Sequence, residues 1–440
     1  MCIRVGPWRI GTCAIFLVAT LDLAGCAGRA TGLMVPVLVE GVPGVTVIPV
    51  LVATTRRNST DDATLFTSDR SRQISYAEIG VSVPPDHKPG AIEWPTEVPG
   101  DPNHQFVTAS VTRLDSESFK STLHREIAHR KQKRVLVFVH GYNNQFDDAL
   151  YRFAQIEKDS EAPDIPVLFT WPSRGKLLAY PYDRESANYS RSALEKVLQS
   201  LVDDPQVKEV AVLAHSMGNW VALEALRQMA IRHGSVPAKI ANVMLAAPDV
   251  DIEVARTQAD DMGPRRPHFT LFVSQDDKAL AYSNKFWGGT ARLGAINPEQ
   301  EPYRSALERL QVTVIDLTKL KGGDSLNHGK FAESPEVVRF IGTQLASGQD
   351  ITTRSAGLGG QLGGLVAGVT DSAGHIATVA VSVPILVVDP QSREALSDNL
   401  RSVVPGANEE PASDLTDGDE LGPVAAPRRA KLIPAKPSVN

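Results

Sequence analysis

The pentapeptide AHSMG (residues 214–218) follows the apolar run Val210–Leu213 and precedes a segment with helical spacing. A strand, a sharp turn with a central serine and a helix are the context that a nucleophile elbow requires. The turn is so tight that only Gly or Ala fits two residues before and two residues after the serine. Ala214 and Gly218 meet this requirement, which makes Ser216 a candidate nucleophile.

Apolar runs and helical segments alternate around this turn. The predicted strands are Val135–Val139, Val167–Thr170, Val210–Leu213, Val243–Ala246, Phe269–Val273 and Val312–Leu317. The predicted helices cover residues 116–131, 146–158, 184–203, 217–233, 252–261, 278–287 and 335–346. The strands are continuous apolar runs, as expected of strands buried on both faces. The pattern predicts an α/β fold with a mostly parallel, doubly wound sheet. Strand-like runs from Val45 and within residues 74–112 predict early antiparallel strands.

A serine hydroxyl becomes a useful nucleophile only when a base takes its proton, and that base is usually a histidine oriented by a carboxylate. In α/β-hydrolases the chain order is Ser, acid, His. His328 lies in a loop after the last predicted strand, where the base is expected. The other histidines after Ser216 fit less well, because they lie on the helix after the elbow, before the acid or in the C-terminal tail. These are His233, His268 and His375.

The acid is expected after the strand Phe269–Val273, where Asp276 and Asp277 stand side by side. Asp277 is preferred because it stands just ahead of a predicted helix start, in an Asp-x-x-apolar arrangement. Asp276 then points elsewhere or caps the helix. Asp249 and Asp251 follow the preceding strand and are a further alternative, although capping of the next helix is the preferred role for them.

An oxyanion needs two preorganised N–H donors. The elbow supplies the amide of Met217 at a helix N-terminus. The loop HGYNN (residues 140–144) supplies the second, for which the amide of Tyr142 is the preferred donor. His140 and His215 are predicted to be structural, with His215 pointing away from the base.

Several motifs together resemble a bacterial family of α/β-hydrolases of unknown function. They are VATTR (52–56), VLVFVHGYNN (135–144), FTWPSRG (169–175), VAVLAHSMGN (210–219) and LAAPDVD (245–251). The resemblance covers about residues 46–345 and implies the hydrolase fold and a Ser/Asp/His triad, but it supplies no substrate. The chain departs from the general elbow pattern at Ala214 and Asn219, where glycines are common.

Only one short helix is predicted between the strands ending at Ala246 and Val273, so no large cap domain is expected. The sequence therefore predicts a serine hydrolase that cleaves carboxylic esters or similar acyl bonds, with a small-molecule or lipid ester as substrate. Two alternatives stay open: an amidase or peptidase with the same triad, and a catalytically silent envelope scaffold on the same fold.

The N-terminus has the pattern of a targeting segment. Two arginines and the apolar stretch Ile10–Leu21 are followed by LAGC (23–26), which resembles the lipobox of bacterial lipoproteins. Residues 1–25 are thus predicted to be a signal peptide, Cys26 a lipidated residue and residues 26–44 a tether. Ala27 is not the Asp-type retention signal, so the resemblance favours an outer-membrane anchor facing the periplasm.

Residues 45–347 form the predicted hydrolase domain, and the composition changes beyond it. Residues 348–404 are Gly-rich and apolar, and Gly360, Gly364 and Gly368 would share one helix face, either to receive a partner helix or as part of a flexible linker. Residues 405–440 contain six prolines and are predicted to be disordered. A net charge of −6 without a long basic block does not favour a nucleic-acid partner. No cofactor or metal site is expected.

Overall fold

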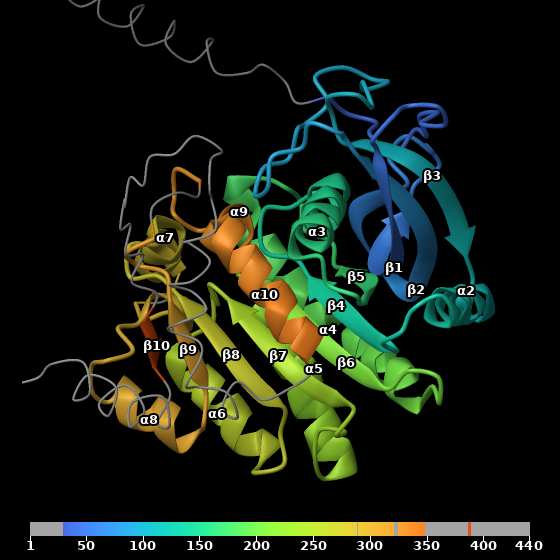
Figure 1. Cartoon of the computed structure of the whole chain (residues 1–440). Helices are drawn as coiled ribbons and strands as arrows, with labels where there is room; N and C mark the ends of the chain where they lie inside the picture. Colours follow the sequence, from blue (N-terminus) through green and yellow to red (C-terminus); the bar gives the residue numbers. More distant parts are fainter. Residues whose placement is uncertain (1–29, 288, 321–323, 348–385, 389–440) are drawn as a thin grey trace, which may run out of the picture. The chain divides into compact units, whose positions relative to one another are not determined.

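The computed structural model describes residues 30–287, 289–320, 324–347 and 386–388 (Figure 1). These belong to one of the chain's two structural units, Met1–Leu396, and the other, Ser397–Asn440, lies outside the described residues. The predictions made for the signal peptide, for Cys26, for Gly360, Gly364 and Gly368 and for the tail also lie outside the described residues.

The described strands form one sheet in the order β10-β9-β8-β7-β6-β4-β5-β1-β2-β3. Strands β4 to β9 are parallel, and β1 joins them by parallel pairing with β5. The bounds are β1 Thr46–Asn58, β2 Phe66–Val83, β3 Val107–Leu114, β4 Arg134–Val139, β5 Ile165–Thr170, β6 Glu209–His215, β7 Ile240–Ala246, β8 His268–Val273, β9 Thr313–Asp316 and β10 Leu386–Val388. The predicted mostly parallel sheet is confirmed.

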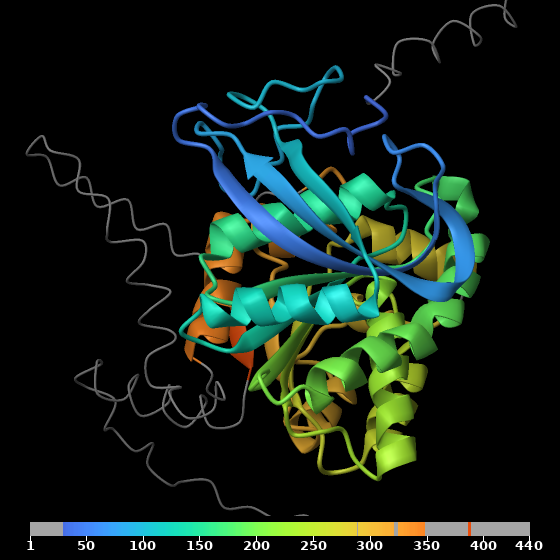
Figure 2. The same cartoon turned by 90° about the vertical axis from the view of Figure 1, so that its right-hand side faces the viewer.

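The first three strands form the predicted antiparallel part of the sheet. Strand β1 pairs with β2, and β2 pairs with β3, both antiparallel. Figure 2 shows these long, curved strands in blue. Residues 33–37 dock here, because Thr108 Oγ1 donates to the Leu33 carbonyl at 2.7 Å and Met34 is buried. A short part of the expected tether, around Leu33 and Met34, thus packs on the domain.

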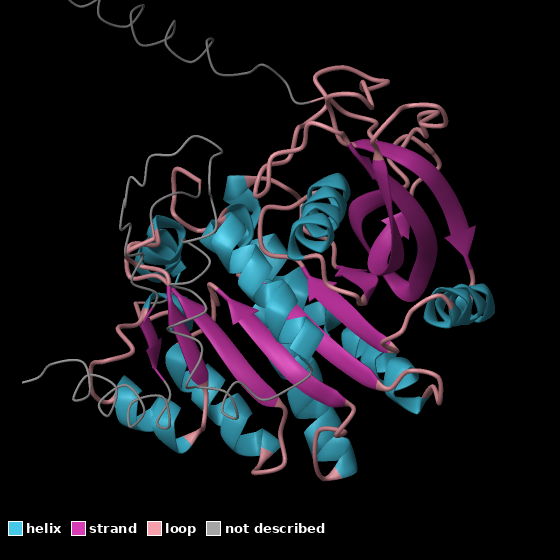
Figure 3. Cartoon of the chain, viewed as in Figure 1, coloured by secondary structure: helices cyan, strands magenta, loops and turns pink. Residues whose placement is uncertain are grey.

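Helices cover both faces of the sheet (Figure 3). They are α2 Ser116–Ala128, α3 Phe146–Ser160, α4 Tyr180–Asp203, α5 Gly218–His233, α6 Ile252–Met262, α7 Lys278–Trp287, α8 Tyr303–Arg309, α9 Lys330–Glu333 and α10 Pro335–Ser347, with short 3-10 turns η1 Leu177–Ala179 and η2 Leu293–Ala295. The sequence predictions missed α8, α9 and both 3-10 turns. Only α6 lies between β7 and β8, so no large cap domain is inserted there, as predicted.

Alternation along β4 explains the two layers. Val135, Val137 and Val139 join a core cluster with α2, α4, α5 and α6, whereas Leu136 and Phe138 join a second cluster with α3, α9 and α10. Successive side chains of a strand point to opposite faces, so a strand with apolar residues at every position must be covered on both sides.

Arg56, near the end of β1, is a buried cation that ties this strand to the loops next to the elbow. Its Nε donates to Thr170 Oγ1 at 2.9 Å, and its Nη atoms donate to the carbonyls of Ser173 and Asn144 at 3.0 and 2.9 Å. Burial lowers the pKa of Arg56 to about 10, against the opposing charge of Asp183. The guanidinium therefore fixes the start of two loops that approach Ser216 from different strands.

Arg56→Met should lower the free energy of unfolding by on the order of 3 kcal/mol, because it leaves several buried acceptors without a donor. Arg57→Met is the matched control, since 63% of the Arg57 side chain is exposed, and should cost less than about 1 kcal/mol. Urea unfolding followed by circular dichroism measures both. Equal losses for the two variants would contradict this role of Arg56.

Candidate active site

Ser216 lies in the turn between β6 and α5 and adopts a φ of 53°. This left-handed conformation is strained for a residue other than glycine, and such strain is typical of functional turns. Two backbone hydrogen bonds hold it: the Ser216 amide donates to the Ala246 carbonyl at 3.0 Å, and the Asp249 amide donates to the Ser216 carbonyl at 3.2 Å. The elbow predicted from the sequence is thus present in the backbone.

Two glycines let the loop after β4 approach this turn closely. A Cβ on Gly218 would lie 2.4 Å from the His140 carbonyl oxygen, and a Cβ on Gly141 would lie 2.8 Å from the Ser216 Cβ. Either contact would force the backbone apart. The absence of a side chain at both positions therefore brings the 140–142 loop against the serine.

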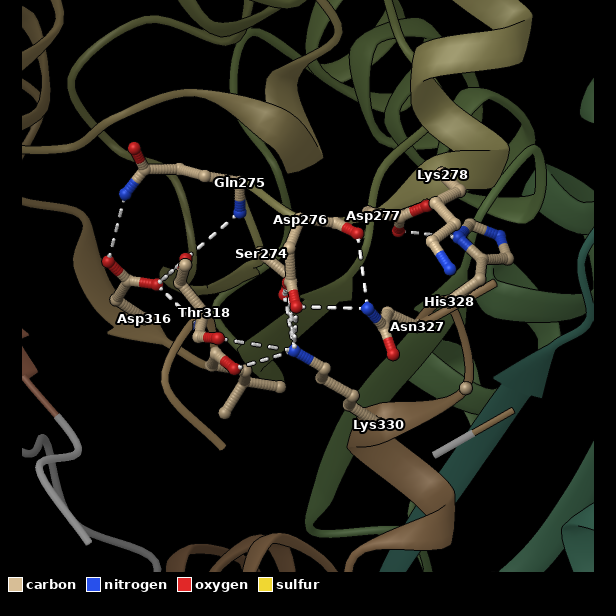
Figure 4. A network of polar contacts seen from close by, with 12 residues as sticks. Ser274, Gln275, Asp276, Asp277, Lys278, Asp316, Thr318, Asn327, His328 and Lys330 are labelled. Carbon is tan, nitrogen blue, oxygen red and sulfur yellow. Dashed lines mark hydrogen bonds and ion pairs between the residues drawn. The ribbon is translucent and has the colours of Figure 1, made fainter. Parts of the chain in front are cut away.

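His328 and Asp277 form a direct pair beside the same cavity. His328 Nδ1 and Asp277 Oδ2 lie 2.7 Å apart, and the other oxygen of Asp277 accepts from the Leu280 amide at 3.0 Å (Figure 4). Burial opposes the charged imidazole, but the hydrogen bond to Asp277 outweighs it and raises the pKa of His328 above its ordinary value. Among the described contacts, no hydrogen bond joins His328 to Ser216.

The two expected oxyanion donors belong to the elbow and to the loop that approaches it. Met217 is the N-cap residue of α5, and Tyr142 follows Gly141 in the loop that contacts Ser216. Among the described residues, neither amide has a hydrogen-bond acceptor. The Tyr142 hydroxyl donates to the Leu177 carbonyl, which fixes this loop to η1.

The serine and histidine both line a cavity of about 610 Å³. Its wall is largely apolar and includes Ile92, Trp94, Phe138, Leu177, Leu178 and Phe331. Within the described residues, no group of three or more His, Cys, Asp or Glu side chains could hold a metal ion. The described helices include none with the length and hydropathy needed to cross a membrane.

Residues 115–345, more than half of the chain, match the family described as "Alpha/beta hydrolase of unknown function (DUF900)". The chain belongs to this α/β-hydrolase family. An uncharacterized protein of Nostoc sp. (strain PCC 7120) is 30% identical over 123 residues, which are 22% of this chain and 32% of that protein. The match thus spans about a third of that relative's length.

A solved structure of esterases from the fungus Rhizomucor miehei is also similar. It is 14% identical, covers 70% of this chain and 84% of that chain, and has a TM-score of 0.28. The family match over residues 115–345, the mostly parallel sheet and the elbow at Ser216 agree with one another in indicating an α/β-hydrolase.

Asp276, the alternative acid in this hydrolase, contacts other residues than Asp277 does. Its carboxylate oxygens lie 2.8 and 2.9 Å from Lys330 Nζ, and it accepts from Asn327 Nδ2 at 2.9 Å and from Ser274 Oγ at 2.5 Å. It faces away from His328 and braces the loop that carries it (Figure 4).

Lys330 is the residue that sequence reasoning missed here. It is only 2% exposed and donates to Ser274 Oγ and to the Leu317 carbonyl, both at 3.1 Å, as well as to Asp276. It thus joins the loop of the acid, the end of β9 and the loop of the histidine. In the sequence it resembles an ordinary surface lysine near a helix start, and only its distance of two residues from His328 could have drawn attention.

The two remaining alternative acids, Asp251 and Asp249, have different hydrogen-bond partners. Asp251 caps α6, as predicted, because it accepts from the amides of Glu253 and Val254 at 2.9 and 3.3 Å. Asp249 does not cap the helix. It lines the cavity and accepts from Tyr180 Oη at 2.9 Å and Ser283 Oγ at 2.6 Å.

A charged neighbour completes the surroundings of Asp249. Arg292 Nε lies 3.3 Å from Asp249 Oδ1, so the carboxylate has a buried counter-charge as well as two hydroxyl donors. Among the described contacts, no hydrogen bond joins Asp249 to His328, whose Nδ1 lies 2.7 Å from Asp277 Oδ2.

The prediction that the His215 side chain points away from the base is wrong. Its ring centroid lies 4.7 Å from that of His328 and 4.5 Å from that of Phe331, so it packs beside the candidate base. Burial lowers the pKa of His215 well below its ordinary value, which keeps the ring neutral. His140 packs inside its loop as predicted, stacked on Trp171 at 4.8 Å.

Lys330→Met should lower the free energy of unfolding by about 3 kcal/mol, because it leaves Asp276 and the Leu317 carbonyl without their buried donor. Lys319→Met, an exposed lysine nearby, should change it by less than about 0.5 kcal/mol. The midpoint of urea unfolding measures both variants. A Lys330→Met protein as stable as the control would show that the lysine is no brace.

Proposed function

We propose that this α/β-hydrolase is a serine hydrolase that cleaves carboxylic esters or similar acyl bonds through an acyl-enzyme. Ser216 is the nucleophile, His328 the general base and Asp277 the residue that orients it. The observation that carries the proposal is the 2.7 Å contact between His328 and Asp277 beside a cavity that also contains a strained, elbow-borne serine.

The reaction follows from these positions. Ser216 Oγ attacks the substrate carbonyl carbon while His328 Nε2 takes its proton, and the carbonyl oxygen becomes an oxyanion. The amides of Met217 and Tyr142 stabilise that charge. When the carbon–oxygen bond to the alcohol breaks, His328 returns the proton to the leaving alcohol, and a water molecule then cleaves the acyl-enzyme by the same proton transfers.

The location proposed for this enzyme rests on the sequence of its N-terminus. Cleavage before Cys26 and lipidation of that cysteine would hold the hydrolase at the outer membrane, facing the periplasm. Amide substrates require the same residues, so a panel of matched p-nitrophenyl esters and anilides distinguishes an esterase from an amidase or peptidase.

Ser216→Ala should abolish labelling by a fluorophosphonate probe and lower p-nitrophenyl ester turnover by about 10⁶-fold, because the nucleophile is removed. Ser283→Ala is the control, since Ser283 lines the same cavity. It should still be labelled, and in-gel fluorescence compares the two. Labelling that survives Ser216→Ala would refute the proposal, and a native protein that neither labels nor turns over substrate would favour a silent scaffold.

The pH dependence tests Asp277. His328 accepts a proton only when neutral, so activity should rise with pH through its pKa, which lies above the ordinary value of about 6.5. Asp277→Asn should move this rise in activity, the acid limb of the pH profile, to lower pH, because the carboxylate no longer favours the charged ring. The same substitution should lower kcat by about 10⁴-fold. Profiles of kcat/KM against pH provide the measurement.

Asp276→Asn is the matched control, because this neighbouring carboxylate pairs with Lys330 and not with His328. Its acid limb should stay where it is in the native enzyme. If Asp276→Asn moved the limb and Asp277→Asn left it in place, the two aspartates would have to exchange roles.

A further inference from the structure

Four exposed apolar side chains line the serine-containing cavity. Leu177 and Leu178 of η1 are 70% and 96% exposed, and Tyr282 and Phe286 of α7 are 56% and 66% exposed. All four line the cavity. They account for four of the ten exposed large apolar residues in the described part of the chain, and we call them the apolar rim.

Polar contacts join the two segments that carry the apolar rim. Tyr180, directly after η1, and Ser283, between Tyr282 and Phe286 in α7, both donate to the carboxylate of Asp249, at 2.9 and 2.6 Å. One buried acid therefore joins the two segments that carry the rim. The two segments are thus held in place relative to each other, and exposed apolar side chains grouped at one cavity are typical of interaction surfaces.

The cavity that the rim lines is also apolar within. Trp94, Phe138 and Phe331 line it together with Ser216 and His328. An acyl chain could lie in this cavity without exposing its methylene groups to water, whose burial is favourable. A protein partner bound to the rim would instead cover the entrance through which substrate must pass.

Cations stand next to the apolar rim on both segments. Lys176 precedes Leu177, and Lys285 precedes Phe286, and both lysines are exposed. Lys285 Nζ lies 6.0 Å from the centre of the Phe286 ring. Apolar side chains flanked by lysines are the combination that binds a membrane interface with anionic headgroups.

We propose that the apolar rim docks this hydrolase on an anionic lipid surface, so that acyl esters of membrane lipids enter the cavity directly from that surface. The docking depends only on the rim and its lysines. The identity of the substrate rests on the proposed function, and the two can be tested apart.

The test places an environment-sensitive nitrobenzoxadiazole probe on Leu178→Cys in the full chain. The native cysteines all precede residue 27, so a protein without the added cysteine gives the background. Ile231→Cys is the matched control, because Ile231 is 59% exposed but lies at the far end of α5 from Ser216. All proteins carry Ser216→Ala, so that no lipid is consumed.

With vesicles of phosphatidylglycerol and phosphatidylcholine, emission from the Leu178 probe should shift to shorter wavelength and rise severalfold, while the Ile231 probe should not change. Lys176→Gln with Lys285→Gln should raise the lipid concentration needed for the half-maximal shift. Three results would overturn the docking proposal: a Leu178 probe that does not respond to vesicles, one that responds no more than the Ile231 probe, or one that is already shielded from water without vesicles.

Fluorophosphonate labelling of the chain with native Ser216, measured in parallel, keeps the two proposals distinct. Labelling without a rim response overturns the docking proposal alone. A rim response without labelling overturns the hydrolase proposal and leaves the docking surface in place.

Discussion

The close approach between the start of α5 and the loop after β4 is the constraint on which the site depends. Gly218 lies against the His140 carbonyl, and Gly141 lies against Ser216. Side chains at either glycine would separate the two elements. Because they meet, the loop that carries Tyr142 lies against the turn that carries Ser216 and Met217. The left-handed Ser216 backbone, which costs about 1–3 kcal/mol, is held there by hydrogen bonds to the strand beside it.

Two adjacent aspartates acquire different surroundings from a single buried lysine. Lys330 neutralises Asp276 and takes it toward the end of β9, whereas Asp277 is left to face His328. A carboxylate beside an imidazole favours its charged form, so the pairing sets the proton affinity of the ring. The brace therefore determines which of the two carboxylates tunes the candidate base.

Features could be predicted from the sequence where they depend on a local residue pattern or on the order of motifs along the chain. Apolar runs predicted the parallel strands, and the elbow, Asp277 and His328 could be chosen by spacing and order. Lys330 could not be recognised, because its partners come from two loops that lie 12 to 56 residues away in the chain. His215 was misplaced because the direction of a side chain at the end of β6 depends on the turn that follows. Short elements such as η1 and α9 have too few residues for a periodic pattern.

Asp249 shows how a residue can look catalytic in sequence and serve the site in another way. It follows a strand beside the elbow, where an acid could stand, yet its oxygens are occupied by Tyr180, Ser283 and Arg292. Tyr180 directly follows η1 and Ser283 belongs to α7, so these contacts join the two segments beside the cavity. The carboxylate therefore fixes the relative positions of the two segments that carry the exposed leucines and aromatic residues. Because Arg292 and two hydroxyl groups already satisfy its charge, Asp249 acts on the shape of the cavity, and Asp277 is left as the carboxylate that bonds to the imidazole.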